Sequence, residues 1–246
     1  INKCMDYKIN IITCDLKHLP QAIIYPYSGN YQSSLILNKQ INWDLKVLQI
    51  IWKYIVQAKI LNQAKVLKIN HKSFEVIEKL SQYANEVELN DKTNREGLAA
   101  KIYFSELFGK DFIRHNEDTI NMALNYGYSI LRSMISRSLV AKGLNPHIGI
   151  FHKGPNNSFN LSDDIIEVFR PLIDNYVHNN ISNDLVFNRE IRIKIVQALT
   201  RKINYDNQKI TISNAINNVI DNIISVIDLG DLNKLKFPDV VIYDDI

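Results

Sequence analysis

The chain has 246 residues, 46% of them hydrophobic, which is enough for a sizeable core in one large domain or in one domain with part of another. With 29 basic and 26 acidic residues, the net charge of +3 does not by itself indicate a protein that binds polyanions. No apolar stretch approaches the roughly 20 residues of a membrane span, and no secretory signal is present. Cys4 and Cys14 are too few for a disulfide framework and lack metal-ligand spacing. We therefore expect a cytoplasmic protein that does not associate with membranes.

The first 34 residues differ in pattern from the rest of the chain. A possible helix end and a β-branched run, together residues 1–14, are typical of a helix followed by a strand. Two prolines and a glycine then indicate a linker over residues 15–34. Residues 35–246 contain mostly helical patterns. Because the chain begins with Ile1 inside what looks like a structural element, we expect a fragment of a longer protein.

The fold class predicted for the rest of the chain is mainly α. Apolar residues recur at helical spacing from Leu35 to about Asn70, with lysines between them that form either a solvated helix face or a track for DNA. A long apolar face over residues 119–141, followed by Gly143, predicts a central helix with a glycine stop. Further helices are expected over residues 73–88, 184–202 and 213–229, and a small hairpin over 205–211.

Glu96 is the first candidate site residue. Thr93 and Glu96 have the spacing of a capping box, which is a sufficient structural reason for this carboxylate. Glu96 also heads a stripe of apolar residues on one helix face, near the core, where a charge needs a cation or a proton as partner. The adjacent Gly97 costs about 1 kcal/mol relative to alanine inside a helix, which indicates close approach by another group.

A second group of candidates lies between Asn145 and Pro171. An apolar run ends at His152, and a loop then leads into a helix for which Ser162 is the predicted N-cap. Asp164 and Glu167 lie one helical turn apart, and with the imidazole they make a plausible site for magnesium or manganese. The alternative is that the acidic residues serve the helix N-terminus and that the histidine packs in the core.

Several ordered motifs resemble those of one known family. They are T-C-D-L-K-H-L-P, N-R-E-G-L-A-A-K-I-Y-F-x-x-L-F-G, I-N-x-x-L-N-Y-G-Y-x-I-L, G-I-F-H and N-x-F-N-L-S-D-D-I-I-E-x-F-R-P. From about residue 12 to about residue 178 the chain resembles the CRISPR-associated adaptation integrase, specifically its type II branch. The resemblance implies a helical catalytic domain, preceded here by the last helix and strand of an N-terminal β-domain. It also implies a metal-dependent endonuclease and integrase that inserts captured DNA as new spacers into a CRISPR repeat array.

The resemblance also implies roles for particular residues. The metal site of the family falls on Glu96, His152 and Glu167, and Asp164 falls where related integrases often carry an additional acidic residue. A Mg²⁺ or Mn²⁺ ion held there would activate a DNA 3′-hydroxyl for attack on a phosphodiester of the repeat. Nearby cations that could contact the DNA backbone are Arg95, Lys101, Arg114, Lys153 and Arg170.

Partners follow from the same resemblance. The implied partners are double-stranded DNA, as both prespacer and repeat, and a second CRISPR adaptation protein whose dimer bridges two integrase dimers. In the family the N-terminal β-domain forms the homodimer, so we do not expect that homodimer from this fragment. Two other functions compete with the integrase. One is a structure-selective, metal-dependent DNA endonuclease, and the other is a catalytically silent helical module for DNA binding or assembly.

Overall fold

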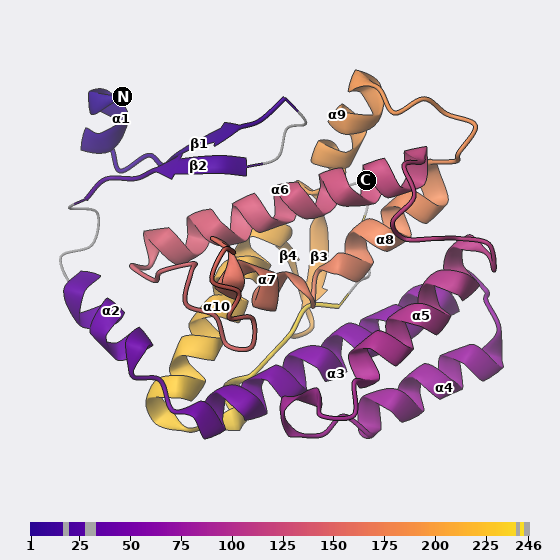
Figure 1. The fold of residues 1–246 in the computed structure, drawn as a ribbon, viewed down its shortest axis with the longest axis horizontal. Coiled ribbons are helices and arrows are strands. Elements are labelled where there is room, and N and C mark those ends of the chain that lie inside the picture. Colours follow the sequence, from indigo (N-terminus) through magenta and orange to yellow (C-terminus); the bar gives the residue numbers. More distant parts are fainter. Residues whose placement is uncertain (17–19, 28–32, 240–241, 244–246) are drawn as a thin grey trace.

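Helices dominate the fold, which confirms the prediction of a mainly α protein (Figure 1). The computed structural model describes residues 1–16, 20–27, 33–239 and 242–243. The α-helices within these ranges are α1 (Asn2–Asp6), α2 (Ser33–Ile41), α3 (Leu45–Ile69), α4 (Phe74–Asn85), α5 (Arg95–Phe108), α6 (Thr119–Ala141), α7 (Asn160–Ile166), α8 (Arg170–Asn180), α9 (Arg189–Ala198) and α10 (Ile212–Leu229). Two short 3₁₀ helices are η1 (Leu89–Asp91) and η2 (Leu232–Lys234).

An antiparallel hairpin stands at the N-terminal end of the chain. Strand β1 (Ile11–Cys14) pairs with β2 (Pro20–Ile24), and Ile11 lies opposite Ile24. The β1 strand and the α1 helix agree with the expected helix and strand. The β2 strand corrects the expectation of a plain linker, because β-branched Ile23 and Ile24 extend the chain beside β1. Residues 17–19 and 28–32 of the expected linker lie outside the described residues, and the domain division stays a prediction.

The long helix α3 is the axis of one half of the molecule. The predicted pattern from Leu35 breaks into two helices, because the Asp44 side chain accepts a hydrogen bond from the Lys46 amide at 2.7 Å and caps a new helix. One face of α3 is buried, including Ile51, Trp52 and Ile55. Helices α4 and α5 lie side by side with it, so α3 carries the face on which the other two are packed (Figure 1).

Helix α6 is the axis of the other half and has the predicted bounds. It contacts α7, α8, α9 and α10. Gly127 lies at its contact with α8, where a Cβ atom would come within 2.6 Å of the Ile173 side chain. The small hairpin is also confirmed: β3 (Lys202–Tyr205) pairs with β4 (Gln208–Thr211), and β5 (Ile242–Tyr243) adds to the other edge of β3.

Helix α7 starts earlier than the sequence predicts. Its N-cap position is Phe159, whereas Ser162 is buried inside the helix. Ser162 is the third residue of the helix, and its hydroxyl lies 2.7 Å from the Ser136 hydroxyl of α6, so it serves the contact between the two helices. Among the described residues, no helix combines the length and the apolarity that a bilayer crossing requires.

Candidate active site

Glu96 projects from the first turn of α5, and the residues that begin this helix differ from those expected. The N-cap is Asn94, in the left-handed conformation, and its side chain accepts from the Gly97 amide at 3.3 Å. Asp91 accepts from the Arg95 and Glu96 amides at 2.8 and 3.1 Å. The capping box with Thr93 is therefore wrong, and Glu96 is free of a capping role. A Cβ atom on Gly97 would lie 2.7 Å from the Asn94 side chain, which explains the glycine.

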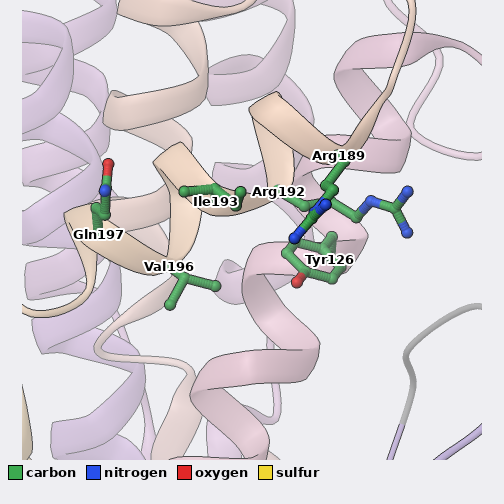
Figure 2. Close-up of a pocket in the computed structure, with 6 residues that line it drawn as sticks. All are labelled: Tyr126, Arg189, Arg192, Ile193, Val196 and Gln197. Atoms are coloured by element: carbon green, nitrogen blue, oxygen red, sulfur yellow. The ribbon is translucent and has the colours of Figure 1, made fainter.

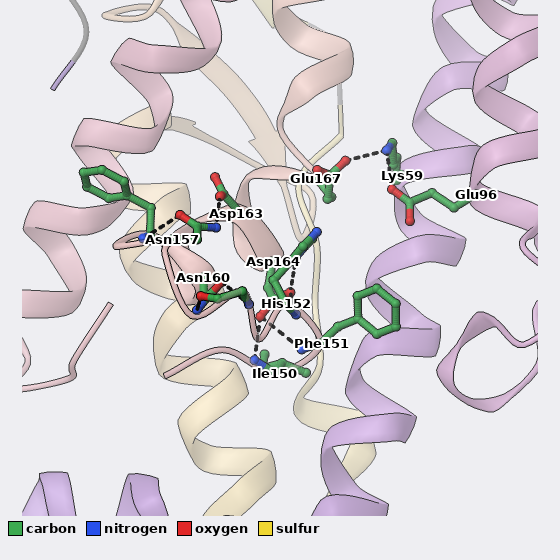
Figure 3. A network of polar contacts seen from close by, with 12 residues as sticks. Lys59, Glu96, Ile150, Phe151, His152, Asn157, Asn160, Asp163, Asp164 and Glu167 are labelled. Carbon is green, nitrogen blue, oxygen red and sulfur yellow. Dashed lines mark hydrogen bonds and ion pairs between the residues drawn. The ribbon is translucent and has the colours of Figure 1, made fainter. Parts of the chain in front are cut away.

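His152 is fixed by Asp164 (Figure 3). One carboxylate oxygen of Asp164 lies 2.7 Å from His152 Nδ1 and accepts from the His152 amide, and the other accepts from the Ile150 and Phe151 amides. The hydrogen bond to Asp164 raises the pKa of His152. Burial raises the pKa of Asp164 although its hydrogen bonds oppose that change. This arrangement leaves Nε2 as the ring nitrogen not held by Asp164.

Aromatic stacking and close backbone contact position the same loop. The Phe151 ring stacks on buried Trp52 of α3 with ring centroids 4.3 Å apart and an interplanar angle of 1°. The His152 ring meets Trp52 edge-on at 5.7 Å. Gly149 lies so close to the loop that a Cβ atom there would be 2.3 Å from the His152 carbonyl oxygen and 2.8 Å from Asp164. Only glycine fits at this position without moving the histidine.

Glu167 follows α7 and is 5% exposed. Its carboxylate accepts from Arg170 Nε at 2.8 Å and forms an ion pair with the ammonium group of Lys59. Burial alone would raise the pKa of Glu167, but Arg170 and Lys59 outweigh it and lower the pKa to about 2. Burial likewise opposes the charge of Lys59, and the two glutamates raise its pKa overall. Both groups are therefore charged at neutral pH.

Lys59 joins the two glutamates that the sequence singled out. Its Nζ atom lies 2.6 Å from Glu96 Oε1 and also contacts Glu167, so a carboxylate of α5 and a carboxylate that follows α7 meet at one cationic position (Figure 3). In the part of the chain that is described, no three His, Cys, Asp or Glu side chains stand close enough together to hold a metal ion as they are. The structure thus brings Glu96 and Glu167 together through an ammonium group, with His152 on the adjoining loop.

A cleft of about 1050 Å³ opens beside Glu167 and Lys59. Arg114 and Arg170 line it together with the ring of Tyr128, over which both guanidinium groups lie, at 5.3 and 4.5 Å from the ring centroid. The Tyr128 hydroxyl donates to buried Asp174, and burial raises the pKa of Asp174 to about 6. Basic and aromatic side chains in one cleft suit the phosphates and bases of a nucleic acid.

The five candidate DNA contacts fall into different places. Arg114 and Arg170 line the cleft. Arg95 turns toward Glu86, with 2.9 Å between Nη2 and the carboxylate, and lies over the Tyr83 ring. Lys101 and Lys153 are exposed outside the residues that line the cleft. The structure thus separates two candidates beside Glu167 from three elsewhere.

A smaller hollow of about 360 Å³ lies between α9 and α6 (Figure 2). Its lining includes Tyr126, Arg189, Ile193 and Val196. Apolar side chains make up much of it, and none of the candidate site residues borders it. It shares Tyr126 and Arg192 with the cleft beside Glu167, so the two hollows adjoin each other.

Sequence reasoning missed three residues of this region: Lys59, Tyr128 and Asp174. For Lys59 a signal was present, because this lysine falls on the apolar stripe of α3, seven residues after Trp52 and three after Val56. A lysine on a buried stripe needs an acidic partner. Tyr128 and Asp174 carried no such signal, since each fits an ordinary helical pattern.

Comparison with known proteins identifies the family. A family described as CRISPR associated protein Cas1 matches residues 1–194. The CRISPR-associated endonuclease Cas1 of Neisseria meningitidis is 32% identical over 241 residues, which are 96% of this chain and 78% of that protein. A Cas1 endonuclease of Francisella tularensis subsp. novicida is 34% identical over 135 residues, or 47% of this chain and 42% of that protein. The chain therefore belongs to the Cas1 family of CRISPR-associated endonucleases, which confirms the predicted class of enzyme.

Solved structures agree on the fold. A casposase bound to its integration product has a TM-score of 0.74 at 20% identity, covering 94% of this chain and 75% of that one. A chain of a partial Cas6-RT-Cas1–Cas2 complex has a TM-score of 0.74 at 16% identity and covers 96% of this chain and 82% of that one. A Cas1 protein of Thermotoga maritima has a TM-score of 0.62 at 18% identity, covering 94% of this chain and 84% of that one.

Proposed function

We propose that this protein is a metal-dependent DNA integrase that joins DNA 3′ ends to a CRISPR repeat, and that it belongs to the type II branch of its family. The observation that carries the proposal is the meeting of Glu96 and Glu167 at one cationic position, beside a histidine whose Nδ1 is held by Asp164. Carboxylates and an imidazole are suitable ligands for Mn²⁺, and Mg²⁺ would use chiefly the oxygens. The donor set therefore fits the implied metal.

The roles of the four acidic and imidazole groups differ. Glu96, Glu167 and His152 Nε2 would hold the ion, and the bound ion would supply a Lewis acid for phosphodiester transfer. Asp164 acts through the histidine: its oxygens are engaged by three amides and by Nδ1, and such a carboxylate sets the tautomer and orientation of a ligating imidazole. We thus propose Asp164 as a positioning residue and not as a ligand.

The cleft beside Glu167 would hold the DNA. Arg170 holds Glu167 on one side and lies over Tyr128 on the other, so it connects the carboxylate to the cleft. Arg114 adds a second guanidinium group. We propose that these two arginines contact DNA phosphates near the reacting bond, and that the remaining three candidates, Arg95, Lys101 and Lys153, contribute less.

The partners are proposed on the same basis. One solved structure with this fold is a partial Cas6-RT-Cas1–Cas2 complex, and another is a casposase bound to an integration product. These likenesses and the sequence motifs support assembly of this chain with DNA and with a Cas2-type adaptation protein. Homodimerisation through the N-terminal β-domain is implied for the full-length family, and we do not propose it for this chain.

A strand-transfer assay in Mn²⁺ tests the proposal. A labelled duplex with free 3′-hydroxyls is offered to a repeat-bearing plasmid, with this chain and a Cas2-type partner, using the wild type and the Glu96→Ala, His152→Ala and Glu167→Ala variants. We expect the wild type to join label to plasmid, and each variant to lose joining by several orders of magnitude while it still binds DNA. Variants that join as the wild type does would refute the site.

The same strand-transfer assay tests the alternative that the protein is a hydrolytic endonuclease. An endonuclease that uses water in place of the 3′-hydroxyl would nick the plasmid without transferring label. DNA binding without metal-dependent joining or nicking, unchanged in Glu96→Ala, would instead indicate a silent DNA-binding module. A duplex ending in 3′-dideoxynucleotides is the matched control, because it blocks joining and leaves hydrolysis unaffected.

A further inference from the structure

Lys59 is the most unusual side chain of the site. It projects from the middle of α3, it is 8% exposed, and its ammonium group contacts the carboxylates of both Glu96 and Glu167. A buried charge is costly unless it is paired, so this lysine is held in place by the two acids and holds them in return. It does so at the position where a carboxylate of α5 and a carboxylate that follows α7 converge.

The charges around Lys59 balance without any other cation. The groups that face it are Glu96 on α5, Glu167 after α7, and Arg170 of α8, whose charge lowers the pKa of Lys59 and whose Nε binds the same Glu167. Two positive and two negative charges therefore share the site. A divalent cation between the glutamates would take the position that the ammonium group now holds, and the repulsion between two cations at contact distance favours displacement of the ammonium group.

We propose that Lys59 is a built-in competitor of the divalent cation: it stands in for the metal between Glu96 and Glu167 and must leave before the metal binds. This inference rests on the proposed metal site and deepens it. Lys59 also borders the cleft beside Glu167, so its long side chain has a neighbouring space into which the ammonium group can turn. In that cleft it is available to a DNA phosphate.

Competition and simple structural support make opposite predictions about metal affinity. If Lys59 only held the glutamates in place, its removal would loosen the ligands and weaken metal binding. If it competes with the metal, its removal leaves Glu96 without this cationic partner and Glu167 paired only with Arg170, and the two carboxylates then bind a divalent cation more tightly. The variant Lys59→Met keeps most of the length and an apolar stem, and it removes the ammonium group with its charge and its hydrogen-bond donors.

The test is Mn²⁺ binding, followed by the loss of the electron paramagnetic resonance signal of free Mn²⁺ at constant pH. We expect Lys59→Met to bind Mn²⁺ at least tenfold more tightly than the wild type. Without metal, we expect the same variant to unfold at a temperature several degrees lower, and Mn²⁺ to reverse this loss. Equal or weaker Mn²⁺ binding by a folded Lys59→Met variant would overturn the proposal.

Controls separate this inference from the metal site itself. Lys65→Met removes a lysine of the same helix that is paired with Asp239 instead of with the two glutamates, and we expect it to bind Mn²⁺ as the wild type does. The double carboxamide variant Glu96→Gln/Glu167→Gln should lose binding. If the wild type and this double variant bind Mn²⁺ alike, the proposed metal site fails. If only the double variant loses binding and Lys59→Met gains none, the competitor role alone fails.

A measurement on the wild type covers the case in which Lys59→Met does not fold. Lysine labelled with ¹⁵N at Nζ should show a slowly exchanging ammonium signal for Lys59 in the metal-free protein, assigned by its absence in Lys59→Arg. We expect this signal to shift or disappear when the site is saturated with Mg²⁺. A signal unchanged at saturating Mg²⁺ would show that Lys59 does not leave and would refute the proposal.

Discussion

Asp164 and His152 are joined by a 2.7 Å contact between Oδ1 and Nδ1, although twelve residues separate them along the chain. The same carboxylate accepts the amides of three consecutive residues that end at the histidine. Asp164 therefore holds both the backbone and the ring of His152, and it leaves Nε2 as the ring nitrogen that can bind a metal ion. The position of the imidazole depends on this one buried side chain.

We expect Asp164→Asn to weaken Mn²⁺ binding by about 10- to 100-fold, which is typical when the partner of a ligating histidine is lost. The amide nitrogen of asparagine cannot accept the hydrogen bonds that the lost oxygen accepted. Mn²⁺ titration and the rate of DNA joining measure the effect. Because Asp164 acts through the ring, the double variant Asp164→Asn/His152→Ala should bind Mn²⁺ no worse than His152→Ala alone.

The neighbouring Asp163 provides the matched control. Its carboxylate accepts from Asn157 at 2.8 Å and pairs with Arg132 at 2.8 Å, so it has no contact with the imidazole. Asp163→Asn should keep Mn²⁺ affinity within about twofold of the wild type, since neither Asn157 nor Arg132 is a partner of the imidazole. A loss as large as that of Asp164→Asn would show that negative charge in this turn, and not contact with His152, matters.

Gly149→Ala should damage the site through its backbone. The added methyl group would lie 2.3 Å from the His152 carbonyl oxygen, so the loop must move or the neighbouring helix must yield. We expect unfolding free energy to fall by about 1–3 kcal/mol, as for other overpacked positions. The rate of DNA joining should fall by more than the loss of folded protein alone would explain. Gly154→Ala is the control, because its nearest neighbour would be 3.4 Å away; equal effects from both would contradict this account.

Asp174 should make stability depend on pH. Burial raises its pKa from an ordinary 3.8 to about 6, so between these values the folded protein holds a proton that the unfolded chain releases. The stabilising contribution of this proton is therefore present below pH 4 and is lost as pH rises through about 6. The difference in unfolding free energy between wild type and Asp174→Asn should shift against the wild type by at most about 3 kcal/mol over that window. Chemical denaturation at each pH measures it, and a flat difference would refute the assignment.

Arg114 should contribute to the affinity for DNA without changing the affinity for the metal ion. It lines the cleft, and its guanidinium group donates to Asn121 and Asn125 at 3.0 and 2.8 Å, which fixes it there. We expect Arg114→Gln to reduce the slope of log affinity against log salt by about 1, with unchanged Mn²⁺ binding. Arg137→Gln, at an exposed position of α6 outside the cleft lining, should leave the slope unchanged.

The sequence predicted the helices better than the contacts of the site. Helix α6 has its predicted bounds because a continuous apolar face and a terminal glycine leave few alternatives. The start of α7 was wrong because Ser162 bonds to Ser136 on another helix, a contact that local spacing does not reveal. The pairing of Asp164 with His152 and the bridge through Lys59 likewise depend on segments that meet only after folding.

The ion pairs of Lys59 have a consequence for how the chain acquires activity. The partners of this lysine lie 37 residues away at Glu96 and still farther along the chain at Glu167, so these contacts close large loops. Contacts of such long range form after local helices, since the entropy of loop closure must be overcome first. A nascent chain emerging from the ribosome would therefore carry α3 and α5 without an assembled centre. We expect no cutting of cellular DNA before the chain is complete through Glu167, which follows α7.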